Sequence, residues 1–290
     1  MAVTGRHPPG HPVHGFERAA GDYDDYAVLQ RIVGDEMLER LQYVRLQPSS
    51  ILDAGCGTGH CTRALRAAYR HARVIGLDQA ASMLMTAQQK RGWLDRTRFV
   101  QADAMQLPVA TGSIDLVFSN LMLQWCDPML VFQEFRRVLT RDGLLMFSSF
   151  GPDTLRELRE AWLAVDQQPH VIDFVDMHDL GDMLMLSGFR EPVMDVDRHT
   201  LTYKDVLDLL RDLHGIGSRN IDVRRSRGLM GRGALQSLAK AYQHFSDQQG
   251  RLPASYEVVY GHAWSGGDPL AGQDHPGTAT VSLDRLRRKP

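Results

Sequence analysis

Cysteine is scarce in this chain of 290 residues: only Cys56, Cys61 and Cys126 occur, and they form no C-x-x-C pair. So small and odd a number argues against a disulfide framework and against a cysteine-based zinc site. No apolar run approaches the length of a membrane span, and the N-terminus lacks the basic-then-apolar order of a secretory signal. We therefore expect reduced thiols, no metal centre and a cytoplasmic location.

A large excess of charge is also missing. The formal net charge is −2 at pH 7, and the 43% hydrophobic and 23% charged fractions are ordinary for a soluble globular protein. No bulk attraction to nucleic acid or to membrane follows, so a charged partner must meet a local patch. Biased composition is confined to the ends of the chain, where we expect a disordered tail at 1–15 and a flexible tail at 266–290.

Apolar strands alternate with helices in the first half of the chain. We predict helical structure at 22–46, 60–69, 81–90 and 127–139 and strands at 50–55, 72–78, 97–103, 114–120 and 143–150. Strands that are apolar throughout are typical of a sheet covered on both faces. Their alternation with helices indicates an α/β fold with a parallel, doubly wound, Rossmann-like sheet.

The second half carries more helix than a sheet crossover needs. Helices are predicted at 153–165, 176–187, 204–214 and 232–248, and strands at 190–202 and 255–264. The two strands would complete the sheet, leaving it mostly parallel with one antiparallel strand. We expect one domain over 16–265, with a helical cap built from about 16–46, 151–175 and 204–250.

A glycine-rich turn, DAGCGTG at 53–59, follows the first predicted strand. The dinucleotide fingerprint G-x-G-x-x-G would need its third glycine at His60, so this loop is of another kind. The Asp53 carboxylate would repel a pyrophosphate, but it suits a ligand that bears an ammonium or sulfonium charge. Glycines let the backbone approach the ligand, and a helix N-terminus offers N–H groups to a carboxylate. S-adenosylmethionine combines these groups, and we predict it as the cofactor.

Residues at the next strand ends fit the same ligand. Asp78 can accept hydrogen bonds from two ribose hydroxyls, and Asp103 can accept one from the adenine amine. Met83 or Met105 can pack on the adenine ring. The residues expected to bind the cofactor are Asp53, Gly55, Gly57, Gly59, Asp78, Met83, Asp103, Ala104, Met105, Asn120 and Leu121.

Each of these positions also has a plainer interpretation. Asp53 and Asp78 can cap helices, Asp103 can be a turn residue, and Met83 and Met105 can belong to the core. Their joint occurrence at four successive strand ends favours the cofactor site.

The motifs DAGCGTG (53–59), GLD (76–78), QADAMQLP (101–108) and FSNLMLQW (118–125) resemble those of class I S-adenosylmethionine-dependent methyltransferases. This likeness covers about 45–150 and implies fold and cofactor. A second likeness covers about 16–264, and its most specific parts are YDxxAxLQ at 23–30, AWxAVDxxPH at 161–170 and LxGIG at 213–217. There the chain is similar to the malonyl-acyl carrier protein O-methyltransferases of biotin synthesis. That resemblance implies methylation of the free carboxylate of a malonyl thioester on acyl carrier protein.

A malonyl carboxylate is ionised near neutral pH, so its methylation needs alignment and desolvation rather than a general base. Tyr23 and Gln30 are candidates for orienting the anion, and Trp125 for walling the pocket. Tyr23, Tyr26 and Gln30 also have the spacing of a helix packing stripe, which is the interpretation we favour for Tyr26. His170 is a weaker candidate.

A local excess of arginine could dock an acidic carrier protein. It consists of Arg211, Arg219, Arg224, Arg225, Arg227 and Arg232, against Asp212 and Asp222. A solvated helix face is the alternative. Nucleic acid is a less suitable partner, because 224–233 has few aromatic residues to stack on bases.

Three other functions stay open at this stage. One is a methyltransferase acting on a quinone precursor or a small carboxylic acid. Another is a respiratory-complex assembly factor that modifies arginine, whose relatives share a stretch similar to SFGPDTLRELR (149–159). The last is cofactor binding without catalysis.

Overall fold

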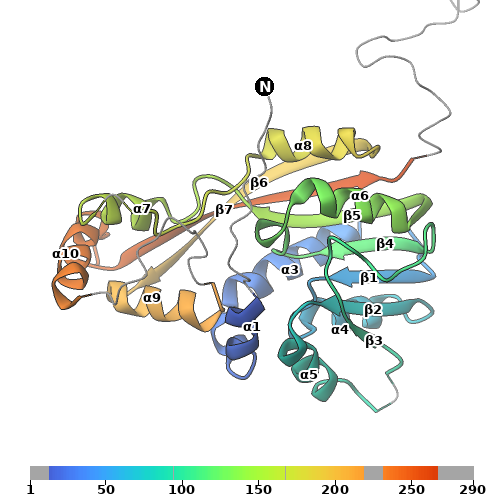
Figure 1. Ribbon diagram of the computed structural model, residues 1–290, viewed down its shortest axis with the longest axis horizontal. Helices are drawn as coiled ribbons and strands as arrows, with labels where there is room; N and C mark the ends of the chain where they lie inside the picture. Colours follow the sequence, from blue (N-terminus) through green and yellow to red (C-terminus); the bar gives the residue numbers. More distant parts are fainter. Residues whose placement is uncertain (1–12, 94, 167, 219–230, 267–290) are drawn as a thin grey trace, which may run out of the picture.

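The computed structural model describes residues 13–93, 95–166, 168–218 and 231–266. A seven-stranded sheet in the order β3-β2-β1-β4-β5-β7-β6 forms its centre (Figure 1). Its strands are β1 (Ser50–Ala54), β2 (Arg73–Asp78), β3 (Arg98–Gln101), β4 (Ile114–Ser119), β5 (Leu139–Phe150), β6 (Arg190–Tyr203) and β7 (Leu252–Trp264). Only β7 among these strands runs against its neighbours, so the mostly parallel sheet with one antiparallel strand is confirmed.

Helices cover both faces of the sheet, as the apolar strands predict. On one face α3 (Val28–Leu41) and α4 (His60–Ala68) pack in a core with Ile51, Leu116 and Leu144. On the other face α6 (Pro128–Val138) and α8 (Met177–Leu186) pack in a second core with Leu52 and Val117. Neighbouring residues of one strand thus enter opposite cores, which explains the continuous apolar runs.

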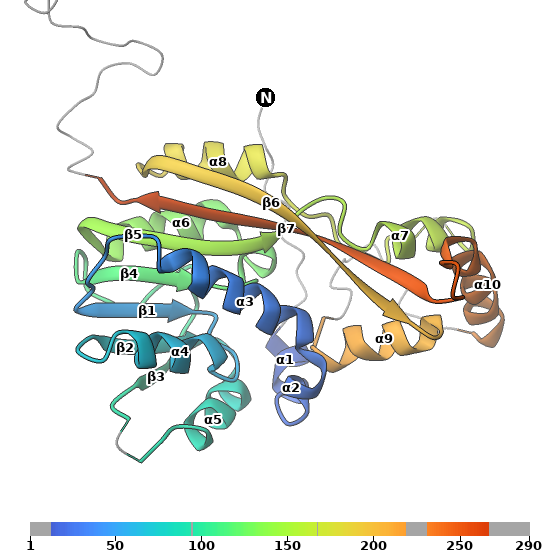
Figure 2. The same ribbon diagram turned by 180° about the vertical axis from the view of Figure 1, so that it is seen from behind.

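The cap is built around an extension of two strands. β5 pairs with β7 only from Leu144 to Phe150, whereas β6 and β7 stay paired out to Tyr203 and Leu252. The helices α7 (Arg156–Leu163), α9 (Val206–Gly215) and α10 (Arg232–Tyr242) gather around this outer hairpin, and η2 (Gln243–Phe245) follows α10 (Figure 2). Tyr203 and Tyr242 are buried in the same apolar cluster as α3, so the cap continues the core.

The N-terminal region differs in detail from the expectation. Helix α1 (Val13–Ala19) begins inside the range expected for the N-terminal tail, whose residues 1–12 lie outside the described part of the chain, as do 267–290. The helical pattern at 22–46 forms α2 (Tyr23–Tyr26) and α3, separated at Ala27, where φ is −80° and ψ is 41°. Helix α5 (Ala81–Gln89) and the 3-10 turn η1 (Leu123–Trp125) complete the elements. No helix in the described ranges has the length and apolar character that crossing a bilayer requires.

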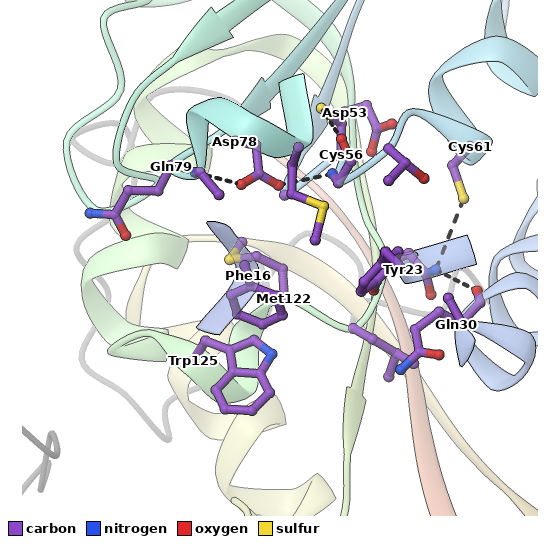
Figure 3. A pocket seen from close by; sticks show the side chains of 18 of the residues that line it. Phe16, Tyr23, Gln30, Asp53, Cys56, Cys61, Asp78, Gln79, Met122 and Trp125 are labelled. Carbon is purple, nitrogen blue, oxygen red and sulfur yellow. Dashed lines mark hydrogen bonds between the residues drawn. The ribbon is translucent and has the colours of Figure 1, made fainter. Parts of the chain in front are cut away.

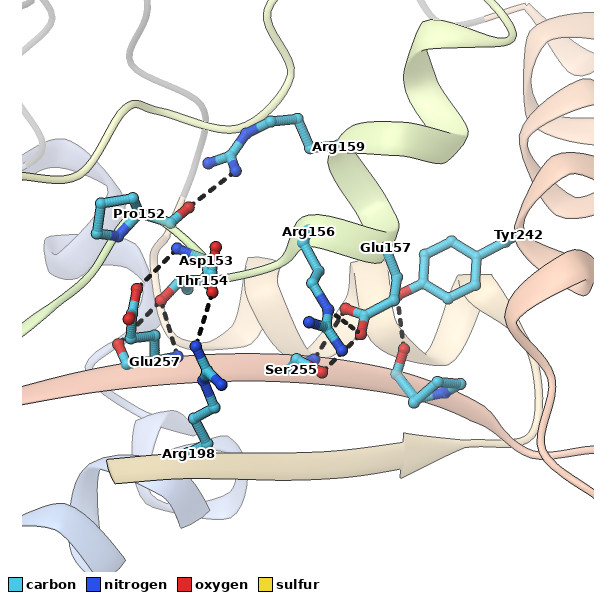
Figure 4. A network of polar contacts seen from close by, with 11 residues as sticks. Pro152, Asp153, Thr154, Arg156, Glu157, Arg159, Arg198, Tyr242, Ser255 and Glu257 are labelled. Carbon is cyan, nitrogen blue, oxygen red and sulfur yellow. Dashed lines mark hydrogen bonds and ion pairs between the residues drawn. The ribbon is translucent and has the colours of Figure 1, made fainter. Parts of the chain in front are cut away.

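A polar joint fastens α7 to β7 (Figure 4). The Glu157 carboxylate is 4% exposed and accepts hydrogen bonds from the Ser255 backbone N–H at 3.0 Å and the Ser255 hydroxyl at 2.6 Å. Nearby, Thr154 Oγ1 donates to the Glu257 carbonyl at 3.0 Å, and Gly151 lies so close that an added Cβ would be 2.5 Å from the Glu257 carboxylate. The stretch SFGPDTLRELR therefore has a structural role: it anchors the cap to the sheet.

A second joint holds α3 to the hairpin. The Tyr260 hydroxyl donates to the Glu36 carboxylate, and His199 Nε2 lies 3.6 Å from Glu36. One ligand-type atom each from Glu36, Asp197 and His199 lies within 4.8 Å of the other two. The hydrogen bond from Tyr260 accounts for the position of Glu36 as part of this joint.

Candidate functional site

A pocket opens at the carboxyl ends of β1, β2 and β4, beneath α1 and α2 (Figure 3). Its empty space is about 1250 Å³ with the open mouth included, which is ample for a nucleoside-sized ligand and a second substrate. The predicted site residues that line it are Tyr23, Gln30, Asp53, Gly55, Gly57, Asp78, Met83, Asp103, Ala104, Asn120, Leu121 and Trp125. Gly59 and Met105 are not among the lining residues.

The glycine loop adopts a backbone that other residues rarely tolerate. Gly55, Gly57 and Gly59 have φ values of 75°, 54° and 79°. A Cβ on Gly55 would lie 2.4 Å from Met122 Cγ, so a side chain here would displace a pocket wall. Gly59 instead serves the fold, because it is the N-cap residue of α4 and a Cβ there would lie 3.1 Å from Ala87.

Asp53 is a buried acid at the base of the pocket. It is 1% exposed, and Thr62 Oγ1 donates to its Oδ2 at 2.5 Å. Burial, with a smaller contribution from the charge of Asp78, raises the pKa of Asp53 from 3.8 to about 7. A cationic ligand would favour the ionised form of this carboxyl, so the site is complementary to positive charge.

Asp78 organises the loop around it. Its Oδ2 accepts from the Gly57 N–H and its Oδ1 from the Ala80 N–H, both at 2.8 Å. The second of these bonds goes to Ala80, the N-cap residue of α5, so Asp78 fixes the turn before α5 and is not the cap of that helix. Burial raises the pKa of Asp78. Each carboxylate oxygen keeps a further lone pair, which a ligand hydroxyl can use.

The turn after β3 holds the next group of predicted residues. Asp103 Oδ1 accepts from the Met105 N–H at 2.9 Å, which fixes the turn and leaves Asp103 and Ala104 lining the pocket. The Met105 side chain packs against the core on the α6 and α8 face instead. Met83 of α5 is 2% exposed and does line the pocket.

The opposite side of the pocket is formed mainly by the N-terminal helices and η1, with Gln30 and Trp125 facing Asp53 and Asp78 across the cavity in Figure 3. The Tyr23 hydroxyl makes no hydrogen bond to another described residue, and burial together with the charges of Asp78 and Asp24 raises its pKa. Tyr23 therefore stays a neutral O–H donor.

Other candidates on this side have different surroundings. Gln30 Oε1 is buried without a hydrogen-bond partner among the described residues. The ring of Trp125 meets Phe16 edge-on at 5.3 Å. Tyr26 packs so tightly that a Cβ on Gly215 would lie 2.4 Å from its ring, which confirms the packing interpretation. His170 stacks on Trp162 at 3.6 Å and does not line the pocket.

Several residues in the pocket or beside it escaped prediction. Asp24 of α2 accepts from the Thr58 hydroxyl at 2.6 Å and pairs with Lys90 at the end of α5, so it fastens α2 over the glycine loop. Glu17 of α1 accepts from the N–H groups of Ala81 and Ser82 at the start of α5, at 2.7 and 2.9 Å. Asp24 and Glu17 lie in or beside sequence that resembles the known family, but nothing local reveals their distant partners. The further lining residues include Phe16, Arg31, Met122, Gln124, Phe150, Ile216 and Ser218.

The arginine-rich stretch is only partly described. Arg211 pairs with Asp208 at 2.6 Å, and Arg232 is exposed at the start of α10. Arg219, Arg224, Arg225 and Arg227 lie outside the described residues. Ser218, the last described residue before them, lines the pocket.

The chain is similar to known methyltransferases in both sequence and fold. Residues 52–147 match the family model described as a methyltransferase domain. The malonyl-[acyl-carrier protein] O-methyltransferase of Laribacter hongkongensis is 52% identical, and that of a Methylovorus species is 50% identical, each over 86% of both chains. Among solved structures, the YcgJ protein of Bacillus subtilis matches with a TM-score of 0.57 at 16% identity, covering 80% of this chain and 98% of the other. That structural match supports the fold alone.

Proposed function

Because this chain belongs to the family of malonyl-[acyl-carrier protein] O-methyltransferases, we propose that it methylates the free carboxylate of a malonyl thioester held on acyl carrier protein. The product would enter the early, pimeloyl-forming steps of biotin synthesis. The observation that carries the proposal is a pocket with two different sides: acids at the strand ends, and beneath the N-terminal helices the neutral Tyr23 and Gln30 with Arg31, where the one acid, Asp24, is paired with Lys90.

The residues present fit S-adenosylmethionine as the methyl donor. Gly55 allows the loop to pack directly against Met122 of the pocket wall, which a Cβ would displace, and the pKa of Asp53, raised to about 7, marks a carboxyl that a cation would ionise. Asp53 and the glycine loop would hold the amino-acid end of the cofactor, Asp78 its ribose and Asp103 its adenine. When bound there, the cofactor would supply a methyl group to the acceptor carboxylate.

The acceptor side needs no catalytic base, since the attacking carboxylate is already ionised. Tyr23, whose raised pKa keeps its hydroxyl protonated, can donate a hydrogen bond to that anion. Arg31 lines the same pocket and can balance the charge, while Trp125 and Phe16 exclude water. Gln30 forms no side-chain hydrogen bond with a described residue, so its amide is available to the acceptor.

We assign carrier docking to the arginines between 211 and 232. Support comes from the position of Ser218 at the pocket, which places the start of this segment beside the site where the acyl group must enter. Reversing Arg224, Arg225 and Arg227 to Glu tests the assignment. Turnover of malonyl-carrier should fall while turnover of malonyl-coenzyme A changes little; equal losses on both, or none on either, would remove the docking role.

The reaction itself is tested by incubating the protein with labelled S-adenosylmethionine and malonyl-carrier. We expect the label on the carrier-bound acyl group as a methyl ester that mild base removes. Label on a quinone precursor or on protein arginine would contradict the proposal, and no transfer to any acceptor would indicate binding without catalysis. The SFGPDTLRELR stretch does not favour the arginine alternative, because its contacts in Figure 4 explain it as a structural joint. Rescue of a biotin-requiring strain that lacks its own malonyl methyltransferase would test the role in the cell.

A further inference from the structure

We propose that Gln124 recognises an amide N–H in the arm that carries the acceptor thioester. This inference rests on the proposed function and deepens it. Gln124 would determine specificity by selecting acceptors whose arm contains an amide. Other residues would bind the reacting carboxylate.

The orientation of the Gln124 amide is fixed by its surroundings. Gln124 lies in η1, and its Nε2 donates to the Leu121 carbonyl at 2.6 Å. Exchanging the two ends of the amide would place oxygen against oxygen, so Oε1 is the end left over. This Oε1 is buried and has no hydrogen-bond partner among the described residues. A buried carbonyl oxygen without a donor is costly, and a ligand N–H at this point would remove that cost.

The frame that holds Gln124 is rigid. Leu121 has a left-handed backbone with φ of 46°, and its N–H donates to Ser148 Oγ at 3.0 Å. Ser148 Oγ in turn donates to Asn120 Oδ1 at 2.9 Å. The carbonyl that Gln124 binds is therefore tied to both β4 and β5, so the amide oxygen is held in place before any ligand arrives.

Gln124 also belongs to the acceptor side of the pocket. The acids suited to the cofactor, Asp53, Asp78 and Asp103, follow β1, β2 and β3. Gln124 follows β4, next to Trp125, and shares the pocket with Phe150 at the end of β5 and with Ile216 beyond α9. With the carrier docked at the arginines proposed above, the acyl arm would enter from the cap and cross this side.

The chemistry of the acceptor limits the donors available to Gln124. An ionised carboxylate has no hydrogen to donate, and a thioester has none either. The first donor along a carrier-bound malonyl thioester is the amide N–H two carbons beyond the sulphur. Acyl carrier protein and coenzyme A share this group, whereas a small free carboxylic acid lacks it.

The test uses two small malonyl thioesters that differ in one group. One is the N-acetylcysteamine thioester, which has the amide, and the other is its acetoxyethyl analogue, in which oxygen replaces the N–H. We expect the wild-type protein to prefer the amide compound about tenfold in kcat/KM. Gln124→Met, which keeps the length but removes the acceptor, should bring the two compounds to nearly equal kcat/KM. Gln133→Met, the same change at an exposed position of α6 outside the pocket, should leave the preference in place.

The other outcomes separate the possibilities. Equal use of both compounds by the wild-type protein would overturn the inference and leave the proposed function intact. So would a Gln124→Met protein that keeps the preference but binds S-adenosylhomocysteine more weakly, because the oxygen would then serve the cofactor ammonium. If the Met variant does not fold, as judged by its thermal transition, Gln124→Ala provides the same comparison, because it also removes the acceptor, and the preference should again be lost. Turnover of neither compound by the wild-type protein, together with no turnover of malonyl-carrier, would overturn the proposed function and this inference with it.

Discussion

The two sides of the pocket are built by different means. The side to which we assign the cofactor consists mainly of short turns, each directly after a parallel strand, and the acids assigned to it fall between Asp53 and Asp103. The side to which we assign the acceptor brings together residues as distant in sequence as Phe16 and Ile216, through helices packed on an extended hairpin. The first side depends on the backbone conformation of its turns, and the second depends on how helices distant in sequence pack together. Substitutions should therefore separate cofactor binding from use of the acceptor.

The two sides of the pocket also differ in the charges of their side chains. Asp53 is buried and Asp78 partly buried, and burial raises the pKa of each. The N-terminal helices bring to the pocket the neutral Tyr23 hydroxyl, the Arg31 guanidinium and Asp24, whose charge is paired with Lys90. A positively charged donor and a negatively charged acceptor would each meet its complement, which brings the reacting groups together without a dedicated acid or base.

The largest expected effect tests the cofactor side. Gly55→Ala should weaken S-adenosylhomocysteine binding by about 100-fold. The alanine would be strained at a φ of 75°, and its Cβ, 2.4 Å from Met122 Cγ, would displace the Met122 side chain. Calorimetric titration measures the affinity. Gly233→Ala is the matched control, since nothing lies within 4 Å of a Cβ at that helix position. Unchanged affinity in Gly55→Ala would contradict the placement of the cofactor beside the loop.

A smaller effect tests how the cap is held. Glu157→Gln should lower the free energy of unfolding by about 2 kcal/mol, because it weakens two hydrogen bonds from Ser255 to a buried carboxylate. Hydrogen bonds from Ser255 help to lower the pKa of Glu157 below 4.5, so its stabilising effect is complete above that pH and is lost as pH falls further. Thermal unfolding from pH 7 downward should show the gap between wild type and variant closing below about pH 4.5. Glu160→Gln, on the exposed side of the same helix, should show no such gap.

The contact between cap and N-terminal helices provides a third test. Gly215→Ala would place a Cβ 2.4 Å from the Tyr26 ring and push α9 away from α2. We expect kcat/KM for malonyl-carrier to fall about tenfold while S-adenosylhomocysteine affinity stays within twofold. Gly21→Ala is the control, because a Cβ there meets nothing within 4 Å. Equal losses in cofactor affinity and acceptor use would show that the two sides are not separable.

The sequence alone predicted the sheet, and most residues expected at the cofactor site do line one pocket, for a physical reason. Strands covered on both faces read as apolar runs, and the carboxyl ends of parallel strands meet at one edge, so motifs at those ends could be placed together. Gly59 and Met105 were the residues placed less well. Gly59 begins a helix, and the Met105 side chain turns into the opposite core.

The acceptor side was less predictable because its features arise from tertiary contacts. Nothing near Asp24 in the sequence shows that it pairs with Lys90, and nothing near Gln124 shows that its oxygen is buried without a donor. Helix α1 is only seven residues long and follows a Pro-rich lead, so the pattern favoured a tail. Such features depend on which elements, distant in sequence, pack against one another in the folded protein.

The smallest expected effect concerns the proton on Asp53. Its pKa of about 7 means that much of the free protein carries a neutral carboxyl at pH 6.5, whereas a bound cation favours the ionised form. Binding of S-adenosylmethionine should therefore release a proton, and affinity should rise as pH increases, by about fourfold between pH 6.5 and pH 8. Calorimetry at pH 6.5 in two buffers of different ionisation enthalpy counts the released protons, and the count should drop to near zero in Asp53→Asn. A pH-independent affinity in the wild-type protein would mean that the cation does not lie beside this acid, and the electrostatic contrast between the two sides of the pocket would then have to rest on Asp78 alone.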